Sequence, residues 1–224
     1  GNLYIATEHG GLNSMDLKTQ KIKRFDSGPS RIPCRTTKSV WYDADRDRLY
    51  VGTFLRGLLC STSSGPFEQI GADVLVEDHQ QIITDLIPWK GNLIVVSQGG
   101  IYLLDLETQK LSWLFTDPDL LSQTGVIIRA AYLDMEDRLW LAPANREILC
   151  VSMDTRKVED ILSVKGMIGK KPVQSITGDN RGNLYFVVVG MGVLRYEPLN
   201  DFWACYNQEQ GQLLTNEPFK VCVT

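Results

Sequence analysis

The chain has 224 residues, and its 23 Lys and Arg against 27 Asp and Glu give a formal net charge of −4. A slightly acidic chain has no electrostatic reason to bind nucleic acid or an anionic lipid surface. Since no apolar run approaches the roughly 18–20 residues that cross a bilayer and no secretion signal opens the chain, we expect a globular segment without nucleic-acid or membrane contact.

The first element, residues 1–7, reads GNLYIAT, and a turn at Gly10-Gly11 joins it to a second run, LNSMD, at 12–16. The opening phrase recurs as DRLYVGT (47–53), GNLIVVS (91–97), DRLWLAP (137–143) and GNLYFVV (182–188). Its anchoring leucines, 44 to 46 residues apart, are Leu3, Leu49, Leu93, Leu139 and Leu184. A period near 45 residues is typical of a repeat architecture.

Each repeat predicts four strands joined as hairpins. Before each of the last four leucine strands comes a first strand, at 38–43, 83–89, 128–134 and 173–179. A glycine-containing turn leads from the leucine strand to a third strand, and a turn such as LETQK leads to a fourth, at 22–25, 111–115, 158–162 and 202–206. No long stretch has a helical period, so the predicted fold class is all-β.

The leucine strands are apolar at consecutive positions, which is expected of a sheet buried on both faces. Four-stranded antiparallel blades stacked around an axis bury both faces, so the pattern predicts a β-propeller over residues 1–224, as a single domain or part of one. Its second strands start near residues 3, 49, 93, 139 and 184. Five repeats fit either a closed five-blade ring or an arc of a larger propeller.

The repeat begins out of phase, because the chain opens on a second strand and PFKVCVT at 218–224 resembles a first strand. We therefore expect Phe219–Thr224 to act as a first strand, beside residues 1–7 in a closed ring and unpaired or paired with another molecule in an arc. Gly11 and Gly100 occupy matching hairpin turns. Such turns require a positive φ, which we expect at one or both glycines.

The repeat resembles the two-component regulator propeller motif, approximately D-x-x-G-N-L-W-I-G-T-x-x-G-G-L-N-x-Y-D-x-x-T-G-K-F. The first repeat matches at Gly1, Asn2, Leu3, Tyr4, Ile5, Ala6, Thr7, Gly10, Gly11, Leu12, Asn13, Asp16, Thr19 and Lys21. The third matches at Gly91, Asn92, Leu93, Gly99, Gly100, Ile101, Asp105, Thr108 and Lys110. The resemblance spans the whole chain and is weaker in the other three repeats.

That family supplies extracytoplasmic sensor regions of hybrid histidine kinases in gut Bacteroides-like bacteria. The resemblance implies a non-enzymatic, periplasmic, carbohydrate-sensing propeller that responds to oligosaccharide fragments and contacts neighbouring blades or domains of its parent chain. The family's propellers have about seven blades. The five repeats of this chain depart from that pattern, so either the ring is smaller or blades are missing.

Catalytic motifs are scarce, since the chain has two histidines, His9 and His79, and no HExxH, G-x-S-x-G or P-loop. GMGVLR at 190–195 lacks the third glycine of a dinucleotide motif and lies between two strands. We therefore expect no catalytic activity and no cofactor. A propeller enzyme of the lyase or lactonase type and a protein-interaction scaffold remain the alternatives, and the sequence leaves homodimerisation open.

Asp43, Asp45 and Asp47 alternate as at the start of a calcium loop. Arg48 stands where that loop needs glycine, and Phe54 where it needs the bidentate glutamate. We expect a polar turn and no metal site. The five cysteines include no CxxC pair, and Cys60, Cys150 and Cys222 lie in apolar runs that predict small buried hydrophobes.

In propellers the loops from strand four to strand one and from strand two to strand three gather on one face. Arg31, Arg35, Arg56 and Arg146 fall on these loops with Lys170 and Lys171, while Arg129 enters an inner strand. Converging guanidinium groups bind carboxylates or sulfates bidentately. The other interpretation is that these arginines are merely solvated or pair with Asp73, Glu77 or Asp78.

Aromatic residues at the same face could stack on sugar rings, and Trp41, Phe54 and Trp89 are the candidates, although most strand aromatics serve packing. Together these patterns predict a small-molecule or oligosaccharide ligand with an anionic group. The candidate binding residues are His9, Arg31, Arg35, Phe54, Arg56, Arg129, Asn145 and Arg146.

Overall fold

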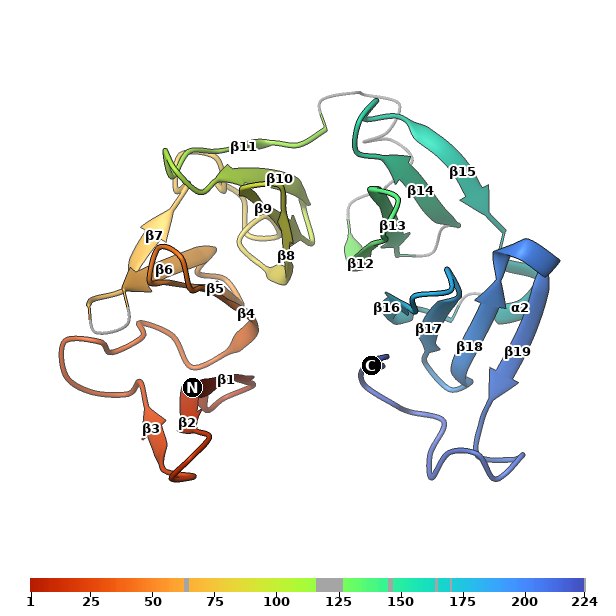
Figure 1. The fold of residues 1–224 in the computed structure, drawn as a ribbon, viewed down its shortest axis with the longest axis horizontal. Helices are drawn as coiled ribbons and strands as arrows, with labels where there is room; N and C mark the ends of the chain where they lie inside the picture. Colours follow the sequence, from red (N-terminus) through yellow and green to blue (C-terminus); the bar gives the residue numbers. More distant parts are fainter. Residues whose placement is uncertain (63–64, 116–126, 145–146, 164, 170, 224) are drawn as a thin grey trace. The chain divides into compact units, whose positions relative to one another are not determined.

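The computed structural model describes residues 1–62, 65–115, 127–144, 147–163, 165–169 and 171–223, which form five antiparallel sheets (Figure 1). Sheet 1 contains β1 (Asn2–Thr7), β2 (Gly11–Asp16) and β3 (Ile22–Arg24). Sheet 2 contains β4 (Thr37–Asp43), β5 (Arg48–Thr53), β6 (Leu58–Thr62) and β7 (Glu68–Ile70). Sheet 3 contains β8 (Ile83–Trp89), β9 (Asn92–Ser97), β10 (Gly100–Asp105) and β11 (Leu111–Trp113).

Sheet 4 contains β12 (Ile128–Leu133), β13 (Arg138–Pro143), β14 (Ile148–Ser152) and β15 (Val158–Leu162). Sheet 5 contains β16 (Val173–Gly178), β17 (Leu184–Val188), β18 (Gly192–Glu197) and β19 (Phe202–Tyr206). Helical structure in the described ranges is confined to α2 (Lys165–Ile168) and the 3₁₀ turn η1 (Pro198–Asn200). The all-β prediction is therefore confirmed, and consecutive strands pair in every sheet.

The predicted strands recur with boundaries shifted by a residue or two, and all five anchoring leucines lie in second strands: β1, β5, β9, β13 and β17. The sequence did not predict β7, whose three residues, Glu-Gln-Ile, are too short and polar to give a pattern. In Figure 1 each sheet is seen as a run of successive strands.

The chain divides into two compact units, unit 1 (Gly1–Leu114) with sheets 1–3 and unit 2 (Phe115–Thr224) with sheets 4 and 5. Within unit 1, β1 lies beside β4 and β4 beside β8, and within unit 2, β12 lies beside β16. Consecutive sheets thus stack inside each unit as predicted. The closed ring or arc, and the division of residues 1–224 into domains, stay predictions.

The cores of the units lie between facing sheets. In unit 1, Tyr50 and Leu58 of sheet 2 meet Leu93 and Val95 of sheet 3. In unit 2, Trp140 of sheet 4 packs with Phe186 and its neighbours in sheet 5. The consecutive apolar positions of β5, β9, β13 and β17 are therefore buried, as the sequence indicated, whereas β1 is partly exposed.

Sheet 1 has three strands and lacks a first strand, as expected of a chain that opens on a second strand. This difference is visible in the exposed fraction of the anchoring leucine. Leu3 is 47% exposed, whereas Leu49 of sheet 2 is 1% exposed because it packs between sheets 1 and 2. Leu93 and Leu184 are buried in the same way against the sheets that precede them in their own units.

The C-terminal segment forms no paired strand in the described residues, which is one of the outcomes that the repeat pattern allowed. Residues 218–223 form no strand, Phe219 is 80% exposed, and Thr224 lies outside the described residues. A first strand exists only where a second strand accepts its hydrogen bonds, which the sequence alone cannot supply. Cys222 is exposed, so its assignment as a buried hydrophobe was wrong, while Cys150 is buried and Cys60 half-buried. All five cysteines are free thiols.

The turn glycines behave as predicted, with φ of 66° at Gly11 and 156° at Gly100. Both values lie in the region that residues with a side chain rarely adopt. A Cβ at Gly100 would also lie 2.4 Å from Cζ3 of Trp113, so this turn requires glycine for space as well as for backbone conformation.

Candidate functional site

The chain enters each first strand at the same end of the sheet at which the second strand turns into the third. We call this the entry end, and the other end the opposite end. At the entry end of unit 1 the second strands finish in a hydroxyl that holds the turn. Thr7 Oγ1 donates to Gly11 O and Thr53 Oγ1 to Gly57 O, each at 2.7 Å.

The entry-end turns also bind the loops that lead into the next sheet. The amide N of Gly11 in sheet 1 donates to O of Arg35 at 2.6 Å, and that of Gly57 in sheet 2 donates to O of Gln81 at 3.0 Å. Turn and loop are therefore fixed to each other by backbone bonds. These bonds hold the loop from β3 to β4, residues 26–36, in place and so fix where its side chains lie.

A cleft of about 650 Å³ lies at the entry end of unit 1, between the β1–β2 turn and the loop from β3 to β4. It brings together three of the predicted residues, His9, Arg31 and Arg35. The other charged groups that line it are Arg24, Glu8 and Asp26. Sequence reasoning missed Arg24, although its register opposite Asn13 on β2 would have placed it at this end of sheet 1.

The guanidinium groups of Arg24, Arg31 and Arg35 form no ion pair with any residue that the structure describes. Arg31 and Arg35 therefore do not pair with Asp73, Glu77 or Asp78 in the described part of the chain, and both are exposed, which the alternative of solvated arginines also allows. The lining of the cleft includes three guanidinium groups and two carboxylates. The cleft is thus suited to a ligand that carries negative charge.

Lys38 and Phe54 lie beside the cleft. Lys38 Nζ is 3.7 Å from Oε1 of Glu8 and 5.7 Å from the centroid of the Phe54 ring. Phe54 is 43% exposed, so it offers an aromatic face that packing does not use up. It follows β5, and its amide N donates to Thr36 O at 3.1 Å.

Arg56 belongs to the same region. Burial raises the pKa of the Cys34 thiol, which lines the cleft, and the positive charge of Arg56 partly offsets that increase. Arg56 lies in the turn after β5, two residues beyond Phe54. Five predicted residues of unit 1 accordingly line the cleft or lie on the turn beside it: His9, Arg31, Arg35, Phe54 and Arg56.

Of the remaining predicted residues, the structure describes Arg129 and Lys171. Arg129 is an exposed residue of β12 in unit 2. Asn145, Arg146 and Lys170 fall outside the described residues. Lys171 lies near the β17–β18 turn, because a Cβ on Gly190 would be 3.8 Å from its Cε.

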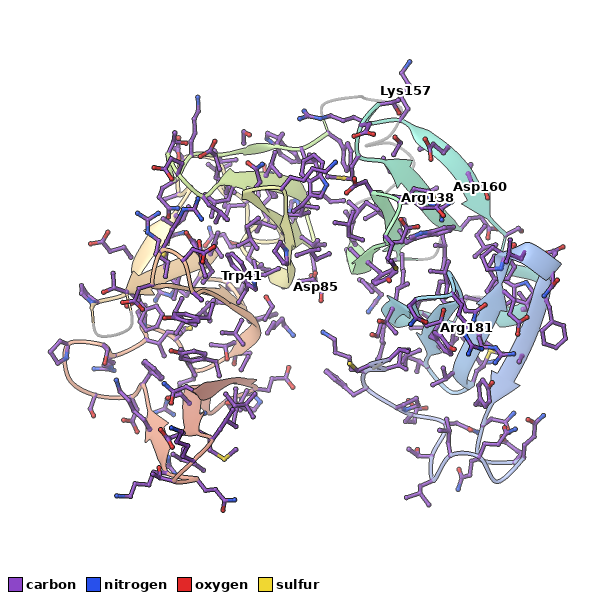
Figure 2. All side chains as sticks on the ribbon, in the orientation of Figure 1. Trp41, Asp85, Arg138, Lys157, Asp160 and Arg181 are labelled. Atoms are coloured by element: carbon purple, nitrogen blue, oxygen red, sulfur yellow. The ribbon has the colours of Figure 1, made fainter. Side chains whose placement is uncertain are left out.

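Two of the three candidate aromatics, Trp41 and Trp89, do not form a binding surface at the entry end. Trp41 stacks on Tyr50 with ring centroids 5.7 Å apart, and it packs against the core of unit 1 (Figure 2). Trp89 is the last residue of β8 and therefore lies at the opposite end, so its assignment to the ligand face was wrong. Only Phe54 keeps that assignment.

A second cleft, of about 420 Å³, lies at the opposite end of unit 2, where Asp134, Arg138, Asp179 and Arg181 line it (Figure 2). Its carboxylates are engaged in turns. Asp134 Oδ2 accepts from Arg138 Nε at 2.8 Å and from Trp140 Nε1 at 2.9 Å. Burial by itself would raise the pKa of Asp134, but these bonds outweigh it and hold that pKa below its usual value.

The calcium-like stretch is a turn of the same kind. Asp43 Oδ1 accepts from the amide of Asp45 at 3.1 Å, and Oδ2 accepts from Arg46 Nη1 at 3.1 Å. Both oxygens are therefore used to stabilise the link between β4 and β5. This observation agrees with the prediction of a polar turn.

No protein-family model matches the sequence, and the search of curated proteins gave no match. Among solved structures, the extracellular domain of a putative hybrid two-component system from B. thetaiotaomicron matches with a TM-score of 0.72 and 15% identity over 96% of this chain. Two structures of another B. thetaiotaomicron extracellular domain, described as a putative one-component or hybrid two-component system, match with TM-scores of 0.67 and 0.66 at 19% and 18% identity.

The alignments with these two structures cover 86% and 94% of this chain. The chain in turn spans only 28%, 25% and 28% of the three solved chains. At this level of identity the likeness shows a shared fold. Within the described residues, no helix has the length and apolar character of a membrane span.

Proposed function

We propose that this chain is part of the extracytoplasmic ligand-sensing region of a hybrid two-component sensor kinase and binds acidic oligosaccharide fragments at the entry end of unit 1. The fold that it shares with extracellular domains of putative two-component systems supports the sensor role and the periplasmic location. The observation that carries the binding site is the cleft lined by Arg24, Arg31 and Arg35. Its role is recognition without catalysis.

The chemistry of the cleft favours an anionic sugar. A guanidinium group stays charged at any physiological pH and holds a carboxylate or sulfate through two parallel hydrogen bonds. The carboxylate of Asp26 can accept hydrogen bonds from sugar hydroxyls, and the exposed ring of Phe54 offers a face for the apolar side of a sugar ring. A uronate or sulfated sugar fragment satisfies all three kinds of group.

The position of the cleft gives binding a mechanical consequence within unit 1. Arg31 and Arg35 lie on the segment that joins sheet 1 to sheet 2, and the amide of Gly11 binds the carbonyl of Arg35. A ligand held by these arginines and by the β1–β2 turn therefore fixes the two sheets relative to each other. Such ordering is a means by which a sensor region can report occupancy.

Calorimetric titration of the chain with oligogalacturonate tests the proposal, with a neutral galactose oligomer as the control ligand. We expect the acidic oligomer to bind and the neutral one to bind much more weakly. Arg35→Ala and Arg56→Ala should each weaken binding, by about 1.5–3 kcal/mol where a bidentate contact is lost. Arg181→Ala, an arginine at the opposite end of unit 2, is the matched control and should leave the affinity unchanged. Binding that neither entry-end variant alters would contradict the proposal.

A further inference from the structure

Each described first strand carries a β-bulge at the same register. In sheet 2, Thr37 pairs with Thr53 and Ser39 with Gly52, so Lys38 is an extra residue. The same shift occurs between β8 and β9, between β12 and β13, and between β16 and β17. The bulged residues are Lys38, Thr84, Arg129 and Gln174.

These bulges are built into the sheets and are not frayed ends, because pairing resumes beyond each of them. The amide of Phe54 donates to Thr36 O at 3.1 Å, and that of Gln98 to Ile82 O at 3.0 Å. In unit 2 the corresponding bonds are Ala144 N to Ile127 O at 2.7 Å and Val189 N to Pro172 O at 3.1 Å. A bulge held on both sides re-aims one side chain reproducibly.

The residues at the bulges are alike in character. Each bulged residue is polar, while the residue immediately before it is buried: Thr37, Ile83, Ile128 and Val173. An extra residue takes its side chain out of the alternation between the two packed faces of the sheet. The bulge therefore allows a polar group on a strand whose neighbours are committed to the core.

The contacts of Lys38 show where such a side chain points. Its ammonium group lies 3.7 Å from the carboxylate of Glu8, on the β1–β2 turn, and 5.7 Å from the ring of Phe54, beyond β5. Both neighbours belong to entry-end turns, and Glu8 lines the cleft. The bulge thus aims a positive charge at the edge of the cleft from a rigid strand.

We infer that the bulged first-strand position is a specificity-determining position of the ligand face, and that Lys38 contacts the acidic group of the ligand. This inference rests on the proposed function and identifies a contact that the loop arginines do not supply. In the protein without ligand, the carboxylate of Glu8 occupies the position beside Lys38 that the acidic group of the ligand takes on binding. Arg129 is the cation at the same register in unit 2, and Gln174 offers a neutral hydrogen-bonding group, whereas the Thr84 hydroxyl donates to Val96 O within its own sheet at 3.3 Å.

The Glu8–Lys38 pair is suited to exchange. The side chains are 62% and 28% exposed, and ion pairs of such exposure contribute little to stability. A ligand carboxylate can therefore replace Glu8 at small cost. Because Glu8 also repels an anionic ligand, its removal and the removal of Lys38 must change the affinity in opposite directions.

The repeat itself supplies the variants for the test. Lys38→Gln introduces the residue that the same bulge holds in sheet 5, and Lys38→Arg introduces the residue that it holds in sheet 4. Glu8→Gln removes the competing carboxylate. Lys18→Met, an exposed lysine in the β2–β3 turn at the opposite end, is the control. Each variant is titrated with oligogalacturonate by calorimetry, and circular dichroism checks its folding.

We expect Lys38→Gln to weaken binding by about five- to tenfold, Lys38→Arg to bind like the original chain, and Glu8→Gln to bind about two- to fivefold more tightly. Lys18→Met should bind unchanged. If Arg35→Ala weakens binding while Lys38→Gln and Glu8→Gln have no effect, the inference is wrong and the proposed function stands. If the original chain binds no acidic oligomer, both are wrong.

Discussion

Units 1 and 2 share one repeat but stabilise corresponding turns with different groups. At the entry end of unit 1, the hydroxyls of Thr7, Thr53 and Ser97 bind the carbonyl of the glycine that opens the third strand. In unit 2, Pro143 and Val188 occupy the same strand position, and neither has a hydroxyl to donate. Among the described residues, this hydroxyl bond is therefore a feature of unit 1.

At the opposite end, both units have turns held by a carboxylate, as at Asp16 and Asp105 in unit 1, but the turns from the first to the second strand differ. In unit 2, Asp134 and Asp179 each accept four hydrogen bonds within their turns. In unit 1, Asp43 accepts two within its turn, and sheet 3 makes the connection with a two-residue turn, Lys90-Gly91, of positive φ. The repeat thus fixes the strands, while turn chemistry varies, and the hydroxyl-held turns occur at the end that carries the arginine cleft.

The largest expected effect is in the carboxylate-held turns of unit 2. Asp134→Asn should lower the free energy of unfolding by about 3 kcal/mol, because an amide cannot accept from the Arg138 and Trp140 side chains as the carboxylate does. Urea unfolding followed by circular dichroism measures the change. Asp73→Asn, at an exposed position, is the control and should leave the unfolding midpoint unchanged. Equal effects of the two substitutions would show that the hydrogen bonds of Asp134 do not stabilise its turn.

The same carboxylate predicts a pH dependence. The folded-state pKa of Asp134 lies below its ordinary value, so its contribution to stability is present above that ordinary value, about 3.9, and is lost as the pH falls through the folded pKa. The stability difference between the original chain and Asp134→Asn should therefore be constant near pH 7 and shrink below about pH 4. A difference that grew on acidification would contradict this sign.

Substitution of turn glycines in unit 1 should give the next largest loss of stability. Gly100→Ala places a Cβ 2.4 Å from the Trp113 ring at a positive φ and should cost about 2 kcal/mol of stability. Gly91→Ala meets only the positive φ, since nothing lies within 4 Å of its Cβ, and should cost about 1 kcal/mol. Thermal unfolding distinguishes the two. If both variants unfold alike, the contact with Trp113 does not constrain the entry-end turn.

The smallest effect concerns the hydroxyls themselves. Thr53→Val keeps the shape of a fully buried side chain but loses the bonds to Gly57 O and from Arg56 N, so it should cost about 1 kcal/mol. Thr155→Val, at an exposed turn position in unit 2, is the control. Chemical unfolding of the two variants decides whether the unit 1 hydroxyls hold their turns. A stability loss no greater for Thr53→Val than for Thr155→Val would show that they do not.

The strands were predictable because each repeat combines an apolar run, a turn signal and an anchoring leucine at a fixed period. The bulges at Lys38 and Arg129 were not. In a sheet buried on both faces, apolar residues already occupy consecutive positions, so an extra residue leaves no break in the pattern. The sequence likewise could not predict that residues 218–223 form no strand, because a strand depends on a partner that local sequence does not specify.

The candidate site was partly predictable. Loop position was enough to bring His9, Arg31 and Arg35 to one cleft, because the loops at one end of a meander converge. Arg24 was missed because it ends a strand and precedes the loop. Trp89 was misplaced because it closes β8, and a strand's last residue lies at the end remote from its entry.

Hydrogen–deuterium exchange of the whole chain, with and without oligogalacturonate, tests the central claim most directly. The account predicts slower amide exchange on binding in residues 8–11, 31–36 and 54–57, which form the cleft and its edge in unit 1. Exchange in residues 44–47, 135–138 and 180–183, the turns at the opposite end, should not change. Slower exchange confined to those opposite-end turns would contradict the assignment of the ligand face.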